Sequence, residues 1–221
     1  MKAKEHFNDK ADRYEALIQK IIPEACLFFG TAVDHVPAEP ASILELGSGT
    51  GFVTEQILAR CPEAEITCID MTPEMLAVAR AKPALSAVRF IEGDFRDVWP
   101  EERFDVVFST LCLHHLTDAD RTAVIRRIRA TLNEEGRFIN GDVFKPESDW
   151  EEALYRDRWR RHMAESGVFE AEAEGMIEKR HNSFGFLDTF GKYREKLIDA
   201  GFQQIFCPYT YEFYGIFVAL R

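Results

Sequence analysis

The sequence predicts an α/β fold in which helices cover both faces of a mostly parallel sheet. Short apolar runs alternate with helical patterns from residue 43 onward, and this alternation is typical of a parallel sheet with helices on both faces. A glycine-rich turn joins the first apolar run to the helix that follows it, as in nucleotide-binding sheets. The last two apolar runs are only a few residues apart, so they must pair antiparallel.

Each predicted strand is a short apolar run that ends beside polar or turn-forming residues. The strands are expected at residues 43–46, 66–69, 88–91, 104–109, 137–143, 203–209 and 213–220. Two helices are expected within residues 1–36, before the first strand. Residues 145–187 interrupt the alternation and predict a charged, aromatic-rich helical stretch. Asp188 is expected to cap the last helix, which Gly201 ends, and the turn Asn133–Gly136 is expected to precede the fifth strand.

Composition limits the partners and the location that we expect. The net charge of −11 and the isoelectric point near 5.1 disfavour nucleic acid and anionic membrane surfaces as partners. The five cysteines are scattered without a C-x-x-C motif, which indicates neither a zinc site nor a disulfide framework. No apolar run approaches membrane length. We therefore expect a cytoplasmic protein that does not bind membranes.

The glycine turn after the first strand is the strongest local signal. Gly47, Gly49 and Gly51 are spaced G-x-G-x-G, so bare backbone can approach a nucleotide-like ligand. Phe52 follows where a dinucleotide-binding turn would continue toward its third glycine. Glu45 lies in the strand two residues before the turn, where a buried carboxylate needs a partner. A generic turn between strand and helix stays open as the alternative.

Several segments in this order resemble the class I S-adenosylmethionine-dependent methyltransferases, in particular small-molecule members of the ubiquinone and menaquinone type. The matching segments are Glu45–Gly51, Asp70 after the second strand, Gly93-Asp94-Phe95 after the third, Phe104–Val107 in the fourth, Leu132–Arg137 before the fifth, and Leu197–Phe202 before the closing strand pair. The N-terminal Phe7–Tyr14 is similar to a segment that precedes the core of many small-molecule members.

The resemblance implies a Rossmann-like three-layer sandwich with a seven-stranded, mostly parallel sheet and an antiparallel last strand. It implies one methyltransferase domain over residues 1–221. Its parts would be an N-terminal helical cap (1–36), a cofactor-binding core (40–144), a helical insertion on the substrate side (145–187), and a closing helix and strand hairpin (188–221). The implied cofactor is S-adenosyl-L-methionine.

The resemblance also implies how the glycine turn would serve this cofactor. Gly47, Ser48, Gly49 and Gly51 would place bare backbone and NH groups against its methionyl part. Glu45 would receive the methionyl ammonium or order a water beside it.

The remaining cofactor contacts would come from the ends of the next three strands. Asp70, roughly 20 residues after the turn, would accept both ribose hydroxyls. Asp94 would accept the exocyclic amine of adenine. Each aspartate has a plainer alternative, a helix cap for Asp70 and a loop turn for Asp94. Apolar contacts to adenine would come from Met71, Met75, Phe95 and Leu111, although a methionine is as readily a core residue.

Three residues are candidates for catalysis. His114 and His115 follow the fourth strand, where the family places the junction between cofactor and acceptor, and histidine can act as a base near neutral pH. They could equally bond backbone and do nothing chemical. Tyr14 competes for the same role if residues 1–22, with Phe7, fold over the site as a lid. No metal-binding motif is present, and methyl transfer from a sulfonium requires alignment and exclusion of water rather than a metal.

The sequence therefore predicts a methyltransferase acting on a small-molecule acceptor that it does not identify. Aromatic residues of the insertion, among them Trp150 and Trp159, are candidates to line the acceptor pocket or merely to pack. A nicotinamide-dependent oxidoreductase and a non-catalytic protein that binds adenosylmethionine stay open as alternatives. So does modification of the cofactor itself, and so does a homodimeric assembly.

Overall fold

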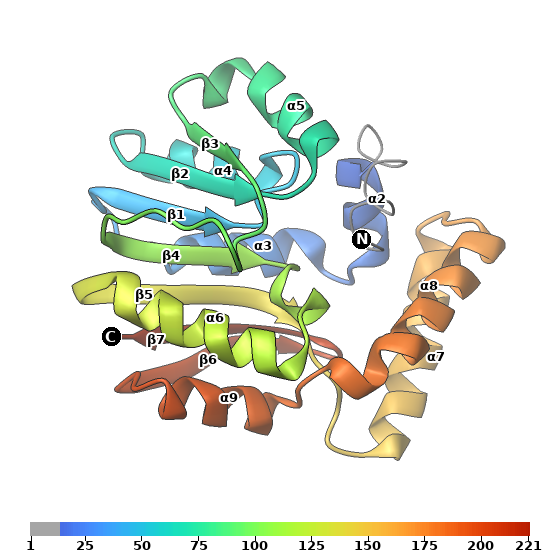
Figure 1. Ribbon diagram of the computed structural model, residues 1–221. Coiled ribbons are helices and arrows are strands. Elements are labelled where there is room, and N and C mark those ends of the chain that lie inside the picture. The colour runs from blue at the N-terminus through green and yellow to red at the C-terminus, as the bar shows by residue number, and fades with distance from the viewer. Residues whose placement is uncertain (1–13) are drawn as a thin grey trace.

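A seven-stranded mixed sheet forms the centre of the molecule, in a computed structural model that describes residues 14–221 (Figure 1). The strand order is β3-β2-β1-β4-β5-β7-β6. The strands are β1 (Ser42–Leu46), β2 (Glu65–Asp70), β3 (Arg89–Glu92), β4 (Phe104–Thr110), β5 (Leu132–Val143), β6 (Gln204–Tyr211) and β7 (Tyr214–Leu220). Among the strands of the described residues, β7 runs antiparallel to the other six, so the predicted fold class, including the antiparallel last strand, is confirmed.

Helices cover both faces of this sheet. One core cluster joins α3 (Ala25–Asp34) and α4 (Phe52–Arg60) to one face, and the other joins α6 (Asp118–Thr131) and α9 (Phe190–Asp199) to the opposite face. The helix α5 (Pro73–Ala81) packs against β2 and β3. Side chains alternate between the faces of a strand, so Ile43 belongs to the first cluster and Leu44 to the second.

Three helices lie at the carboxyl ends of the parallel strands. They are α2 (Tyr14–Ile21) and the adjacent helices α7 (Asp149–Glu165) and α8 (Glu170–Ser183). In Figure 1 they lie beside the tips of the strand arrows. Trp159 of α7 donates a hydrogen bond of 2.6 Å from Nε1 to the carbonyl of Ile21, which ties the insertion to the N-terminal helix. Ligands of open α/β sheets bind at this edge.

Two details of the sequence prediction change. Asp188 does not cap α9, because the cap is Thr189, whose hydroxyl accepts from the backbone NH of Lys192. Asp188 is instead buried in an ion-pair cluster. The segment 133–136 lies within β5 rather than before it, but it bulges out of the ladder, since Phe104 pairs with Leu132 and Val106 with Arg137.

The predicted lid falls partly outside the described residues. Phe7 and the rest of residues 1–13 lie there, so only the segment from Tyr14 onward can be placed. In the described part of the chain, no single helix is long and apolar enough to cross a membrane, although α2 and α3, bent by 102°, reach that length and composition together.

Candidate functional site

The glycine turn between β1 and α4 contains three residues in the left-handed region. Gly47, Gly49 and Gly51 have φ values of 72°, 56° and 75°, which only glycine adopts without cost. A Cβ at Gly49 would meet no atom within 4 Å, so its bare backbone faces open space. A Cβ at Gly51 would lie 2.4 Å from Leu85 Cδ1. Gly49 is thus exposed to a ligand, whereas Gly51 serves the packing of α4.

A cavity of about 270 Å³ lies beside this turn, and we call it the cofactor-side cavity. The residues predicted for the site that line it are Gly47, Gly49, Asp70, Met71, Met75, Asp94, Phe95, Leu111, His115 and Tyr14. The structure adds Thr72, Arg96, Thr110, Cys112 and Leu116, which the sequence analysis missed. Most of the added residues directly neighbour predicted ones in the chain, so the same strand-end rule could have found them.

Asp70 connects the second strand to the glycine turn. One carboxylate oxygen accepts a 2.8 Å hydrogen bond from the NH of Gly49, and the other accepts one of 2.8 Å from the NH of Thr72. Burial raises the pKa of Asp70, and these backbone bonds oppose the rise. The Thr72 side chain and the backbone NH of Met71 also bond this carboxylate, so a ligand hydroxyl would share it with these groups. Asp70 can therefore hold the turn and a ligand together.

Asp94 is held by a neighbour that the sequence analysis did not consider. Arg96 Nε donates to both carboxylate oxygens at 3.0 Å, Nη2 donates to Oδ2 at 2.6 Å, and the backbone NH of Arg96 donates to Oδ1 at 2.9 Å. The Arg96 guanidinium lowers the pKa of Asp94. Most acceptor positions on Asp94 are thus already used, so an adenine amine would share this carboxylate with Arg96.

Two residues predicted to contact the cofactor, Glu45 and Ser48, do not line the cofactor-side cavity but a second, much smaller cavity of about 30 Å³ next to the glycine turn. Glu45 is 1% exposed and accepts a 2.6 Å hydrogen bond from Thr54 Oγ1. The hydroxyls of Ser48 and Thr50 also line this space, and both are buried without a partner among the described residues. A buried donor or acceptor without a partner costs about 1–3 kcal/mol, so these groups suit a polar ligand or a water.

A third cavity, of about 190 Å³, lies on the other side of Tyr14, and we call it the acceptor-side cavity. Its lining is mostly apolar: Leu17, Ile18, Ile21, Ile22, Leu111, Val143, Trp159, Met176, Leu187 and Phe213. Its polar lining is Tyr14, His114, His115, Lys179, Arg180, Ser183 and Tyr214. Of the predicted aromatic cage, Trp159 lies here, whereas Trp150 is 72% exposed and does not.

Three residues line both large cavities: Tyr14, Leu111 and His115. Leu111 has a φ of +51°, a conformation that costs a bulky residue about 1–3 kcal/mol and often marks a functional site. Burial, with Cys112 and Asp70 nearby, raises the pKa of Tyr14 far above its usual range. Its phenol therefore stays protonated and can donate a hydrogen bond, but cannot act as a base at neutral pH.

His114 is oriented by a carboxylate at the end of β5. Its Nδ1 lies 2.5 Å from Asp142 Oδ1, and its backbone NH donates to Asp142 Oδ2 at 3.1 Å. The ring packs beside that of His115, with centroids 3.9 Å apart. Because Asp142 engages Nδ1, Nε2 is the nitrogen left for the acceptor-side cavity, which the ring lines. The two histidines thus differ in position, since only His115 reaches both cavities.

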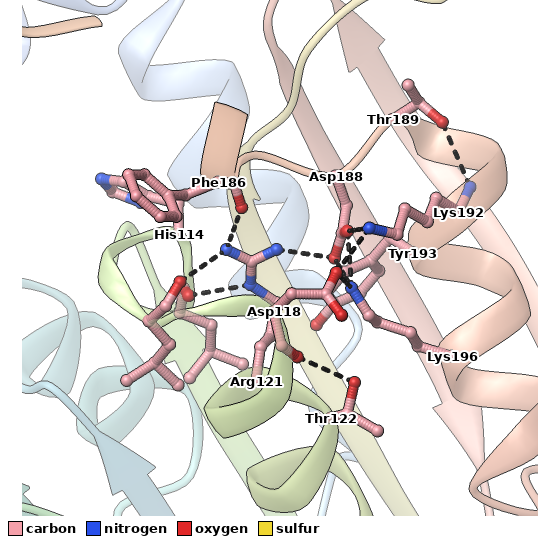
Figure 2. A network of polar contacts seen from close by, with 12 residues as sticks. His114, Asp118, Arg121, Thr122, Phe186, Asp188, Thr189, Lys192, Tyr193 and Lys196 are labelled. Carbon is pink, nitrogen blue, oxygen red and sulfur yellow. Dashed lines mark hydrogen bonds and ion pairs between the residues drawn. The ribbon is translucent and has the colours of Figure 1, made fainter. Parts of the chain in front are cut away.

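A buried arginine holds the turn that carries these histidines. Arg121 is 2% exposed and donates to the carbonyls of Leu113, at 3.0 Å, and Leu116, at 2.9 Å, one before and one after His114 and His115 (Figure 2). It also donates to the carbonyl of Phe186 at 2.8 Å and to Asp188 at 2.6 Å. Arg121 therefore fastens the histidine turn to the segment that follows α8.

The residues present fit S-adenosylmethionine. A zwitterionic methionyl end needs an acceptor for its ammonium and donors for its carboxylate, and Glu45 lies with unpartnered hydroxyls beside the glycine turn. A ribose needs hydroxyl acceptors, and Asp70 in the lining of the cofactor-side cavity would be one. The adenine needs apolar walls, for which Met71, Met75 and Phe95 lie in the same lining.

Comparison with known proteins agrees with this geometry. Residues 43–136 match the family model described as a methyltransferase domain. The chain is 32% identical over 177 residues to the malonyl-[acyl-carrier protein] O-methyltransferase of Paenibacillus sp. (strain JDR-2), covering 77% of this chain and 58% of that relative. It is 28% identical to the enzyme of the same name from Halorhodospira halophila, covering 87% of this chain and 67% of the relative. The chain therefore spans only part of the length of these curated relatives.

Solved structures share the fold over a wider span. The DhpI–SAH complex superposes with a TM-score of 0.69 at 17% identity, covering 97% of this chain and 93% of that one. Human N-acetylserotonin methyltransferase in complex with SAM gives a TM-score of 0.59 at 21% identity, covering 88% and 50%. The cofactor indicated by the family and by these complexes is S-adenosylmethionine. The matched domain model and the similar curated relatives, on the shared sheet, identify residues 43–136 as a class I S-adenosylmethionine-dependent methyltransferase domain.

Proposed function

We propose that this protein transfers the methyl group of S-adenosylmethionine to an oxygen atom of a small organic acceptor held in the acceptor-side cavity. One observation carries the proposal: the cofactor-side and acceptor-side cavities meet at Tyr14, Leu111 and His115. Displacement at a methyl group requires donor and acceptor to approach in line. Two cavities with a shared wall of three residues provide that arrangement.

When bound, S-adenosylmethionine supplies an activated methyl group, so the chain's own work is to align the acceptor and exclude water. The apolar lining from α2 and α7, with Ile18 and Trp159, keeps water out of the transfer region. Leu111, fixed in its left-handed conformation, stands between the two cavities. His114, held by Asp142, can accept a proton from an acceptor hydroxyl through Nε2, or donate a hydrogen bond to an acceptor that is already ionised.

The names of the relatives support oxygen as the accepting atom. The relatives from Paenibacillus and Halorhodospira are both named malonyl-[acyl-carrier protein] O-methyltransferases, so a malonyl thioester is the first acceptor to test, free or on a carrier protein. A cytoplasmic location and a homodimer stay predictions.

The experiment combines binding with transfer. Calorimetry should show binding of S-adenosylmethionine and S-adenosylhomocysteine, with no comparable binding of NAD or NADP. The protein should then move a labelled methyl group from the cofactor to the malonyl thioester of N-acetylcysteamine or of an acyl carrier protein, or to a phenol or alcohol in a panel of acceptors. Tyr14→Phe keeps the shape of the shared wall and loses the phenolic donor, so it should slow transfer with little effect on cofactor affinity.

Two outcomes would contradict the proposal. Tight binding of a nicotinamide cofactor without adenosylmethionine binding would favour the oxidoreductase alternative. Normal cofactor binding with no protein-dependent transfer to any acceptor of the panel would favour the non-catalytic alternative.

A further inference from the structure

We propose that Arg121 is a positioning residue for methyl transfer, and that it acts by fixing the histidine turn (residues 113–116) to the segment around Leu187 in the wall of the acceptor-side cavity. This inference rests on the proposed function and adds a residue to the groups that carry it out. Within residues 14–221, the lining of the two large cavities does not include Arg121, so Arg121 acts through other groups and is not a catalytic residue.

Two hydrogen bonds of Arg121 enclose the histidines. Nε donates to the carbonyl of Leu113 at 3.0 Å, and Nη2 donates to that of Leu116 at 2.9 Å. These carbonyls come immediately before His114 and immediately after His115 in the chain. Both histidines line the acceptor-side cavity. One side chain therefore fixes the two ends of the turn that carries them.

The other two contacts enclose Leu187 in the same way. Nη2 also donates to the carbonyl of Phe186 at 2.8 Å, and Nη1 donates to the carboxylate of Asp188 at 2.6 Å (Figure 2). Leu187, between them, is buried and lines the acceptor-side cavity. A guanidinium is planar and presents its N–H groups in fixed directions. Arg121 therefore sets the spacing between two wall segments that are far apart in the sequence.

This second segment is anchored beside the residue that orients His114. The backbone NH of Lys145 donates to the carbonyl of Asp188 at 3.0 Å. Lys145 follows closely after Asp142, whose carboxylate contacts the ring of His114. His114 is therefore held twice, at its ring by Asp142 and at its backbone by Arg121, and both contacts lead back to the end of β5.

Stability alone does not account for this buried arginine. Arg121 and Asp188 are each 2% exposed, and Lys196 Nζ lies 2.5 and 2.6 Å from the two carboxylate oxygens of Asp188. Charges are costly to remove from water, and apolar residues of similar volume often stabilise a protein as well as a buried ion pair does. Apolar residues cannot, however, donate directed hydrogen bonds to three carbonyls. We therefore assign Arg121 to the geometry of the cavity wall and Lys196 to the charge balance of Asp188.

The position of the turn matters because methyl transfer depends on alignment. His115 lines both large cavities and His114 lines the acceptor side, so a displaced turn moves the groups that meet the acceptor beside the methyl group. A misplacement of about 1 Å can lower a rate about 100-fold. Much of the apolar lining comes from other elements, such as Ile18 of α2 and Trp159 of α7. Loss of the bonds from Arg121 should therefore lower kcat far more than it raises KM.

The first test compares Arg121→Lys with a matched control. Lysine keeps the charge but has three N–H donors on one nitrogen for four acceptors, so the ion pair with Asp188 can persist while the enclosing bonds cannot all form. For the acceptor that the parent methylates fastest among the malonyl thioesters, phenols and alcohols, kcat should fall about tenfold to 100-fold, with KM and the affinity for S-adenosylhomocysteine within about threefold. Lys196→Met removes the other cation from Asp188 and leaves the enclosing bonds, so it should lower stability in urea unfolding and keep the parent's kcat.

The second test observes the histidine turn without any acceptor. Nitrogen NMR of isotope-labelled imidazoles, in protein saturated with S-adenosylhomocysteine, reports which ring nitrogen carries the proton. His114→Gln identifies the signals of that residue. In the parent and in Lys196→Met, neutral His114 should hold its proton on Nδ1, which faces Asp142. In Arg121→Lys the signals of the two nitrogens should become more alike, because a displaced turn weakens the contact with Asp142.

The outcomes distinguish this inference from the function beneath it. If Arg121→Lys keeps the parent's kcat, or if Lys196→Met lowers kcat as much, Arg121 serves only stability and the inference is wrong. If kcat falls while the signals of His114 are unchanged, Arg121 does not act through the turn, and the inference is equally wrong. In these cases the parent is active and the proposed function stands. If the parent binds S-adenosylhomocysteine but methylates no acceptor of the panel, the proposed function itself fails and this inference falls with it.

Discussion

Replacing Glu45 by Gln should make the unliganded protein more stable above pH 7 while weakening its hold on the cofactor. Burial raises the pKa of Glu45 to about 7, although hydrogen bonds from Thr54 and Cys68 oppose the rise, and the nearby charge of Asp70 adds to it. The carboxyl group is therefore partly protonated at neutral pH in the absence of ligand. Glutamine has the shape of that protonated form and carries no charge to bury.

The size and sign of the effect follow from the two pKa values. An unfolded glutamate titrates near 4.5, so the folded state holds its proton more tightly between pH 4.5 and about 7. The stability contributed by protonated Glu45 is therefore fully present below pH 4.5 and is lost as the pH rises through 7. A difference of about 2.5 units corresponds to roughly 3 kcal/mol, at about 1.4 kcal/mol per unit. Glu45→Gln avoids this loss, because its side chain does not titrate.

Urea unfolding at several pH values measures the effect. The parent's free energy of unfolding should fall between pH 5 and 8 relative to that of Glu45→Gln, and the variant should be the more stable protein at pH 8 by up to about 3 kcal/mol. Cofactor binding should show the opposite preference, because the methionyl ammonium needs an ionised partner. The parent's affinity should weaken about tenfold for each pH unit below 7, and this dependence should be smaller in Glu45→Gln.

Either of two results would refute the reasoning. If Glu45→Gln is less stable than the parent at pH 8, the buried carboxylate is well compensated and burial does not govern its pKa. If both proteins bind S-adenosylmethionine with the same affinity and the same pH dependence, Glu45 does not receive the ammonium. Thr54→Val offers a control, since it removes the hydrogen bond to Glu45 and should raise the pKa of Glu45 further.

Three further predictions follow from single contacts. Asp70→Ala should weaken cofactor binding by about 2–4 kcal/mol in calorimetry, and Asp70→Asn by less; unchanged affinity in a folded Asp70→Ala protein would reduce Asp70 to a structural role. Gly49→Ala should fold with a loss of about 1 kcal/mol for its left-handed φ, and it should bind cofactor poorly. Gly51→Ala should instead lose stability, because its Cβ would clash with Leu85 and Ala79. The reverse pattern in thermal unfolding and calorimetry would contradict the assignment of Gly49 to the ligand and Gly51 to packing. Arg121→Met should cost about 3–5 kcal/mol in urea unfolding, because Asp188 and the histidine turn lose their buried partner; a loss below 1 kcal/mol would show that Lys196 alone satisfies the cluster.

The sequence by itself determined the sheet and most of the residues that line the cofactor-side cavity, because both depend on local order along the chain. Parallel strands place their carboxyl ends at one edge, so residues that follow consecutive strands must meet there. This is why Gly49, Asp70 and Asp94, separated along the sequence, line one cavity. The alternation of apolar runs and helices sufficed to predict every strand, with bounds that differ by a few residues.

Tertiary structure decided what those residues face and what holds them. Three side-chain pairings show this. Arg96 binds the carboxylate of Asp94, Asp142 orients His114, and Asp188 pairs with Arg121 instead of capping α9. Such pairings form only when the chain folds, so the spacing of residues along the sequence does not predict them.

The acceptor side depended on tertiary structure most of all. Its cavity joins α2, α7 and α8, which lie outside the repeating strand–helix order, to residues that follow β4. In the sequence, Arg180 is one of several charged residues in the stretch 145–187. Only packing shows it buried over Phe213, with one nitrogen that has no partner within residues 14–221. Burial depends on how helices assemble, whereas strands and turns follow from the local spacing of residues.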